Sequence, residues 1–208
     1  MTAPARAADR RPRPAWQRSA LIMAVIIAGL FVVEAIDAAG DYALDQEGIA
    51  PRSVSGLTGI LWAPFLHVDF AHLIANAIPG AILGFLLLLA GRFLAVTAVV
   101  WVVSGFGVWL LAPAGTVTVG ASGIVFGWLT YLLVRGLFNR HIWQVLGGLV
   151  LLAVYGGMLW GVLPQGGTVS WQGHLCGALG GVLAAWMLSG VDKRVSGGRT
   201  AQVTAGPR

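Results

Sequence analysis

The chain has 208 residues, of which 57% are hydrophobic and only 10% are charged. A soluble domain of this size carries charge on roughly 25% of its residues, so the composition excludes an ordinary soluble domain and predicts a protein that meets lipid. The formal net charge is +5, but the basic residues lie at the ends of apolar runs instead of on one folded face, which excludes a nucleic-acid partner. The single cysteine, Cys176, excludes an internal disulfide framework and a thiolate metal cage.

Six segments are long and apolar enough to cross a hydrocarbon core, which requires about 20 helical residues. In chain order they are Ala20–Ala39, Val68–Ala90, Phe93–Leu111, Ala121–Phe138, Ile142–Leu163 and Gly173–Val191. The first is too long and uninterrupted for a signal-peptide core, so we expect it to be retained. The sequence therefore predicts an all-α, six-helix membrane domain over residues 20–191.

The basic residues predict the orientation of this domain, because short cytoplasmic loops retain Lys and Arg. With the N-terminus inside, twelve of the thirteen Lys and Arg residues are cytoplasmic and only Arg52 is outside. Residues 1–19 and 192–208 are then expected to be disordered cytoplasmic ends. The second, fourth and sixth segments all begin at the outer face, and the excess of Arg over Lys suggests a GC-rich bacterial source and its plasma membrane.

The longest external segment, residues 40–67, contains an apolar stretch too short to span the bilayer. Its apolar side chains are Ile60, Leu61, Trp62, Phe65 and Leu66. This composition favours a piece that lies in the membrane interface over an ordinary loop with a few anchoring aromatic residues.

Polar side chains within the apolar segments are few, and each is a candidate functional residue because such groups are costly in lipid. His67, His72 and Asn76 lie near the start of the second segment, Ser122 near the start of the fourth and His174 near the start of the sixth. Taken singly, each has a structural explanation, such as helix packing or interhelical hydrogen bonding.

The shared direction of these three segments places the candidates at one depth. His72 and Asn76 are four residues apart, so they lie on one helix face. Ser122 and His174 each lie among glycines, which permits the close helix crossing that a Ser–His hydrogen bond of about 2.6–3.2 Å requires. These glycines are Gly120, Gly123 and Gly127 around the serine and Gly173, Gly177, Gly180 and Gly181 around the histidine.

Two other uses of these residues fit the sequence less well. A zinc site would need a His pair at i, i+4 with an intervening Glu, and only Asp69 is a nearby carboxylate, so no metal or other cofactor is expected. The nucleophile elbow of soluble hydrolases requires Gly two residues after the serine, where this chain has Ile124.

The pattern resembles the rhomboid family of intramembrane serine proteases. The resemblance rests on His67, His72 and Asn76, on Gly120-Ala121-Ser122-Gly123, and on His174 followed by Gly177 and Gly181. It implies that Ser122 is the nucleophile and His174 its general base. His72, Asn76 and the Ser122 amide would stabilise the oxyanion, and His67 would have a structural or loop role.

The sequence departs from this family at two places. Many members have a Trp-Arg pair in the external loop, where this chain has Thr58 and Gly59 at the nearest positions. Phe126 stands four residues after the serine, where some members have Tyr. A phenyl ring can still pack on His174, although it brings no hydroxyl group.

The resemblance implies substrates that are membrane proteins. A spanning helix must unwind before a serine can reach its carbonyl groups, so helix-weakening residues are expected near the cleavage site. The substrate would enter sideways, and the glycines of the fifth segment either loosen that wall or merely pack against a neighbour. They are Gly147, Gly148, Gly156, Gly157 and Gly161. The alternative functions are a non-catalytic client-binding relative and a small transporter, and the sequence does not indicate an oligomeric state.

Overall fold

The computed structural model describes residues 13–164, 166–167 and 169–204, and within these ranges its regular elements are helices and one isolated β-bridge. The long helices are α1 (Ala15–Ala39), α3 (Phe70–Leu89), α4 (Phe93–Leu111), α5 (Ser122–Asn139), α6 (Ile142–Tyr155) and α7 (Trp171–Thr204). The short elements are α2 (Gly59–Trp62) and the 3-10 turns η1 (Ala43–Glu47), η2 (Ser55–Leu57), η3 (Ala63–Phe65) and η4 (Gly156–Val162).

The helix count differs from the predicted six, because the described part of the chain contains seven α-helices, among them the four-residue α2. Four helical segments, α1, α3, α4 and α6 with η4, are long and apolar enough to cross a membrane. Helices α5 and α7 are not among these four. Residues 123–132 of α5 are all buried, so its neighbours shield it from lipid and its own sequence need not be uniformly apolar.

Two helices extend beyond their predicted limits. Helix α1 begins at Ala15, directly after Pro14, and α7 continues to Thr204. The segments 15–19 and 192–204, which the sequence predicts as disordered, are therefore helical. Residues 1–12 and 205–208 of the predicted disordered ends lie outside the described residues.

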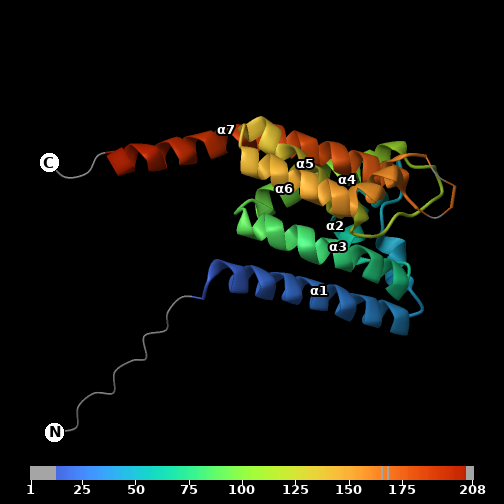
Figure 1. Cartoon of the computed structure of the whole chain (residues 1–208). Helices are drawn as coiled ribbons and strands as arrows, with labels where there is room; N and C mark the ends of the chain where they lie inside the picture. The colour runs from blue at the N-terminus through green and yellow to red at the C-terminus, as the bar shows by residue number, and fades with distance from the viewer. Residues whose placement is uncertain (1–12, 165, 168, 205–208) are drawn as a thin grey trace, which may run out of the picture.

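The helices form a bundle, and different helix termini lie at its two ends (Figure 1). Helix α1 packs on α3, while α5 and α7 form the central pair, with α4 against both and α6 against α5. One end of the bundle, which we call the site end, contains the C-terminal ends of α1 and α4 and the N-terminal ends of α3, α5 and α7 (Figure 1). The first residues of α1 and the last residues of α7 lie at the opposite end, which we call the far end (Figure 1).

The bundle interior is filled by apolar side chains from α3, α4, α5 and α7. Leu83, Leu87, Val100, Leu129 and Ala184 have no exposed surface. Burial of side chains of this size stabilises a fold by roughly 1.5–3 kcal/mol each relative to exposure in water. This packing fixes α5 against α7 and therefore fixes the start of α5 against the start of α7.

Glycines allow the α5–α7 pair to approach backbone to backbone. A Cβ atom on Gly177 would overlap the carbonyl oxygen of Gly123, and one on Gly181 would overlap that of Gly127. A Cβ on Gly127 would lie 2.7 Å from the Gly177 carbonyl oxygen. The close crossing expected from the sequence is thus present, and on α5 it lies within the first two turns of the helix.

Arg52 and Trp109 anchor the loop of residues 40–67 to the end of α4. Arg52 donates through Nη1 to the carbonyl oxygens of Leu110 and Ala112, at 3.0 and 2.8 Å, where α4 ends. Trp109 Nε1 donates to the Ser53 carbonyl at 2.8 Å. At Gly59, one of the two positions that depart from the family pattern, a Cβ would overlap the Gly48 carbonyl. Glycine is used there because two backbone segments touch.

The apolar stretch of this loop folds into the helical turns α2 and η3. Ile60 and Leu66 are buried against the bundle, whereas Leu61, Trp62 and Phe65 are 60%, 53% and 40% exposed. An apolar surface of this kind is what an interfacial segment would present to lipid, and its location in the membrane interface stays a prediction.

Acidic side chains gather where α1 meets the loop of residues 40–67. Glu34 and Asp37 are buried, and Asp37 accepts a hydrogen bond from the Leu44 amide at 2.8 Å. Partial burial, followed by the charge of Asp37, raises the pKa of Asp45 from 3.8 to about 6. At a given pH, the protonated form of Asp45 is therefore more populated in the folded chain than in the unfolded chain.

This arrangement predicts a pH-dependent stability of the loop. Because the folded-state pKa of Asp45 is raised, its contribution is fully present below about pH 4 and is lost as the pH rises through about 6. Asp45→Asn is expected to flatten the change in unfolding midpoint between pH 4 and pH 7, whereas the control Asp41→Asn, at an exposed carboxylate of the same loop, keeps it. Equal pH profiles for the wild type and Asp45→Asn would contradict this assignment.

Candidate active site

Ser122 and His174 lie in hydrogen-bond contact at the site end. Ser122 is the first residue of α5, and His174 lies in the first turn of α7. His174 Nε2 is 2.9 Å from Ser122 Oγ. The two residues are 52 positions apart in the sequence, and the glycine crossing of α5 and α7 brings their backbones close enough for this contact.

The other ring nitrogen of His174 determines the direction of this hydrogen bond. His174 Nδ1 is 3.0 Å from the carbonyl oxygen of Gly161 in η4. A carbonyl oxygen only accepts hydrogen bonds, so Nδ1 carries the proton of a neutral imidazole and Nε2 presents a lone pair to the serine hydroxyl. In this tautomer His174 can take a proton from Ser122.

Phe126 and Gly161 enclose the imidazole. The Phe126 ring stacks on His174 with a centroid separation of 4.1 Å and an interplanar angle of 8°. A Cβ on Gly161 would lie 2.9 Å from the Phe126 ring and 3.2 Å from His174 Nδ1. The absence of a side chain at Gly161 therefore permits both the stacking and the backbone hydrogen bond, and the phenyl ring packs as expected without a hydroxyl group.

Gly120 shapes the turn that leads into Ser122. Its φ angle is +116°, a conformation that residues with a Cβ rarely adopt. A Cβ there would also lie 2.7 and 2.9 Å from Cε1 and Nε2 of His72. The Gly120 amide donates to the Ala63 carbonyl at 2.8 Å, and Ile49 and Thr118 form an antiparallel bridge. These contacts fix residues 118–120, which lead into Ser122, against the loop of residues 40–67.

His72 and Asn76 lie on α3 and face the same cavity as the Ser122–His174 pair. This cavity has a volume of about 550 Å³, and its lining includes all four residues. Asn76 is buried, and its Nδ2 donates to the His72 carbonyl at 2.9 Å, which leaves its second amide hydrogen for another acceptor. Asp69 caps α3 by accepting from the His72 amide at 2.6 Å.

His67 lies behind His72, away from the cavity lining. It is fully buried, and its ring meets that of His72 edge to face at 5.2 Å. Burial, and then the neighbouring His72, lower the pKa of His67 to about 4, so the ring is neutral at pH 7. Its Nε2 accepts a long hydrogen bond of 3.4 Å from the Ala121 amide. His67 thus contacts the turn before Ser122, and its structural role stays a prediction.

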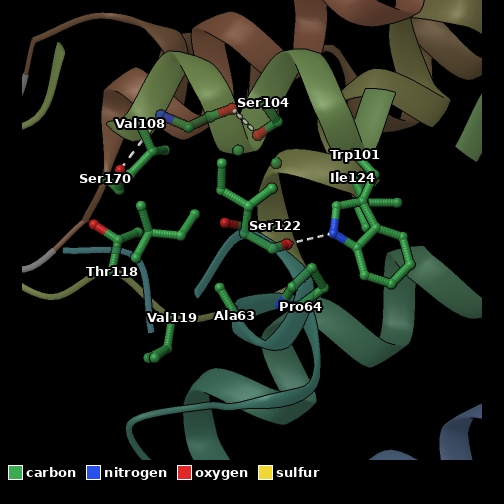
Figure 2. A pocket seen from close by; sticks show the side chains of 16 residues that line it. Ala63, Pro64, Trp101, Ser104, Val108, Thr118, Val119, Ser122, Ile124 and Ser170 are labelled. Carbon is green, nitrogen blue, oxygen red and sulfur yellow. Dashed lines mark hydrogen bonds between the residues drawn. The ribbon is translucent and has the colours of Figure 1, made fainter. Parts of the chain in front are cut away.

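A small cavity of about 30 Å³ adjoins Ser122 on the side of α4 (Figure 2). Its lining includes Ser104, whose hydroxyl donates to the Gly173 carbonyl at 3.0 Å, and Trp101, whose Nε1 donates a hydrogen bond to the Ile60 carbonyl. The volume of this space is sufficient for a single water molecule.

Some contributors to the site carry no signal in the sequence. Gly161 acts through its backbone carbonyl, which every residue possesses, and Ser104 lies within the long uncharged stretch as one small polar residue among apolar ones.

Among the described residues, no group of three His, Cys, Asp or Glu side chains is arranged to hold a metal ion.

Comparison with known proteins finds a matching family model and similar proteins from mycobacteria. A family model described as the Rhomboid domain matches residues 54–191. An uncharacterized protein of Mycobacterium tuberculosis is 46% identical over 192 residues, which cover 88% of this chain and 80% of the relative. An uncharacterized protein of Mycobacterium leprae is 45% identical over 196 residues, which cover 89% of this chain and 77% of that protein.

Proposed function

The chain belongs to the rhomboid family, and from this premise we propose that it is an intramembrane serine endopeptidase in which Ser122 is the nucleophile and His174 the general base. The observation that carries the proposal is the 2.9 Å contact between Ser122 Oγ and an Nε2 atom whose lone pair is directed to it by the Nδ1–Gly161 hydrogen bond. A serine hydroxyl is a poor nucleophile without an adjacent base, and this geometry supplies one.

The proposed reaction has two stages. In the first, Ser122 Oγ attacks the scissile carbonyl carbon while its proton moves to His174 Nε2. The tetrahedral intermediate then collapses, the carbon–nitrogen bond breaks, and the Nε2 proton passes to the leaving amine. In the second, water attacks the acyl-enzyme, His174 takes a proton from the water, and the proton returns to Ser122 as the ester bond breaks.

Negative charge on the substrate oxygen requires donors during both stages. The Ser122 amide lies at the N-terminus of α5, where no intrahelical acceptor uses it and the helix dipole favours negative charge. Asn76 contributes its second amide hydrogen, and His72 lines the same cavity. We assign these three groups to oxyanion stabilisation.

The proposed substrates are transmembrane segments of other proteins. The cavity of about 550 Å³ accommodates a short extended peptide rather than a helix about 10 Å wide, so the segment must unwind before cleavage. Residues with low helix propensity, such as Gly and Pro, facilitate unwinding. Within α6 only Gly148 is buried, so the wall formed by α6 and η4 is the proposed route of lateral entry.

We further propose that the site end faces the exterior of a bacterial plasma membrane and that both termini are cytoplasmic. The support is the distribution of basic residues, of which only Arg52 lies in the external loop. A reporter fused to the C-terminus tests this orientation, and an external reporter would overturn it.

Covalent labelling by a fluorophosphonate tests the proposed function directly. The wild-type protein is expected to react at Ser122, and Ser122→Ala is expected not to react. Ser189→Ala, which removes a partly exposed hydroxyl on α7 that bonds only the Trp186 carbonyl among the described contacts, serves as the control and should label like the wild type. A folded wild-type protein that neither labels nor cleaves would favour the non-catalytic client-binding alternative.

Asn76→Ala is expected to slow cleavage of a membrane-embedded substrate by about 10²-fold. Loss of one oxyanion donor costs about 10²–10³ in rate, and two donors remain in a wet site that weakens electrostatic effects. The variant should still react with the fluorophosphonate. Asn139→Ala, which removes an amide at the far end, is the control. If Asn76→Ala folds normally and cleaves at the wild-type rate, Asn76 serves only in helix packing.

A further inference from the structure

A second large cavity lies at the far end of the bundle, between the end of α3, the end of α5 and the beginning of α6. Its volume is about 570 Å³. The side chains that line it include Leu86 and Leu89 from α3, Leu132 and Arg135 from α5, and Trp143 and Leu151 from α6. It is therefore an apolar groove between membrane helices with one cationic side chain in its lining.

Arg135 has no carboxylate partner among the side chains that the structure describes. Its guanidinium carbon lies 6.0 Å from the centre of the Tyr131 ring, a cation–π distance. The acidic residues with described side chains are Glu34, Asp37, Asp41, Asp45, Glu47 and Asp69, and all of them belong to α1 and the loop at the site end. The charge in the groove is thus uncompensated by this part of the protein.

We propose that this groove binds an anionic phospholipid, with an acyl chain along the leucines and the phosphate at Arg135. The bilayer offers ligands that combine a long apolar chain with a single anionic group, which is the combination that the lining matches. A guanidinium group binds phosphate through two parallel hydrogen bonds. Basic pockets between membrane helices are typical of sites for acidic lipid headgroups.

Gly147 provides a way to fill the groove without disturbing the fold. It lines the cavity, and a Cβ built on it meets no other heavy atom within 4 Å. Gly147→Leu should occupy the space of the acyl chain while Arg135 stays in place. Gly29→Leu on α1, where a Cβ also meets nothing, is the matched control outside the cavity.

The test measures lipid retained by the purified, delipidated full-length protein by native mass spectrometry. Phosphatidylglycerol, phosphatidylcholine and inorganic phosphate are added separately. The wild type is expected to retain phosphatidylglycerol in preference to phosphatidylcholine and to retain no free phosphate. Arg135→Gln should lower that preference about fivefold, the contribution of one basic residue near an anionic lipid. Arg135→Lys should lower it less, and Arg18→Gln, an exposed arginine at the same end, should not lower it.

Gly147→Leu should reduce retention of both lipids, and Gly29→Leu should leave both unchanged. Equal retention of the two lipids by the wild type would overturn the proposal, as would a wild-type phosphatidylglycerol preference in Arg135→Gln together with wild-type lipid retention in Gly147→Leu. Binding of free phosphate as strong as that of the lipid would assign Arg135 to a soluble anion instead. None of these measurements depends on proteolytic activity.

Discussion

Ser122→Ala and His174→Ala are each expected to reduce cleavage of a membrane-embedded substrate to background, a loss on the order of 10⁶-fold. In the proposed mechanism the serine supplies the covalent route, and the histidine is the only base within hydrogen-bond distance of the serine oxygen among the described contacts. Because the two residues act as one unit, the double variant should be no slower than either single variant.

Controls separate this loss from a general effect on the protein. His141→Ala removes an exposed histidine at the far end, and it should cleave at the wild-type rate. Cleavage by the wild type should also survive a metal chelator. Loss of activity in the chelator with recovery on addition of zinc would contradict the dyad mechanism, and so would substantial cleavage by Ser122→Ala.

The pairing of Ser122 with His174 follows from features that a sequence displays. Charge placement gives three segments one direction, the position of each polar residue near a segment start gives a common depth, and glycines four residues apart mark a close crossing. The structure has this crossing at Gly177 and Gly181. Such inferences succeed because the type and spacing of side chains indicate which helix surfaces pack together.

Other parts of the site depend on backbone geometry, which side-chain patterns do not record. The Gly161 carbonyl points at His174 only because α6 ends in the 3-10 turn η4. The sequence predicts only that Arg52 is a single basic residue in the loop of residues 40–67. In the structure its guanidinium donates hydrogen bonds to two carbonyl groups at the end of α4. Likewise, the short helix α2 lies in a segment whose composition indicates an interfacial location but no particular fold.

Gly177→Ala is expected to destabilise the protein and to inactivate it. The added methyl group would overlap the Gly123 carbonyl oxygen, and this oxygen belongs to a helix backbone that cannot rotate away. The helices must therefore separate, at a cost near or above the upper end of the 1–3 kcal/mol typical of overpacked cores. Gly147→Ala, where the new methyl group meets nothing, should instead be neutral or stabilising by up to about 1 kcal/mol.

The position of the substituted glycine along the crossing determines how far activity falls. Gly123 follows Ser122 directly, and Gly177 is one turn after His174, so separation at this point lengthens the 2.9 Å contact between Nε2 and Oγ. Gly181 is one turn further from the site, and its Cβ would overlap the Gly127 carbonyl. Thermal unfolding in detergent should show similar losses for Gly177→Ala and Gly181→Ala, whereas cleavage at a temperature where both are folded should fall further for Gly177→Ala. Equal activities in the two variants would mean that the crossing stabilises the bundle without setting the distance between Nε2 of His174 and Oγ of Ser122.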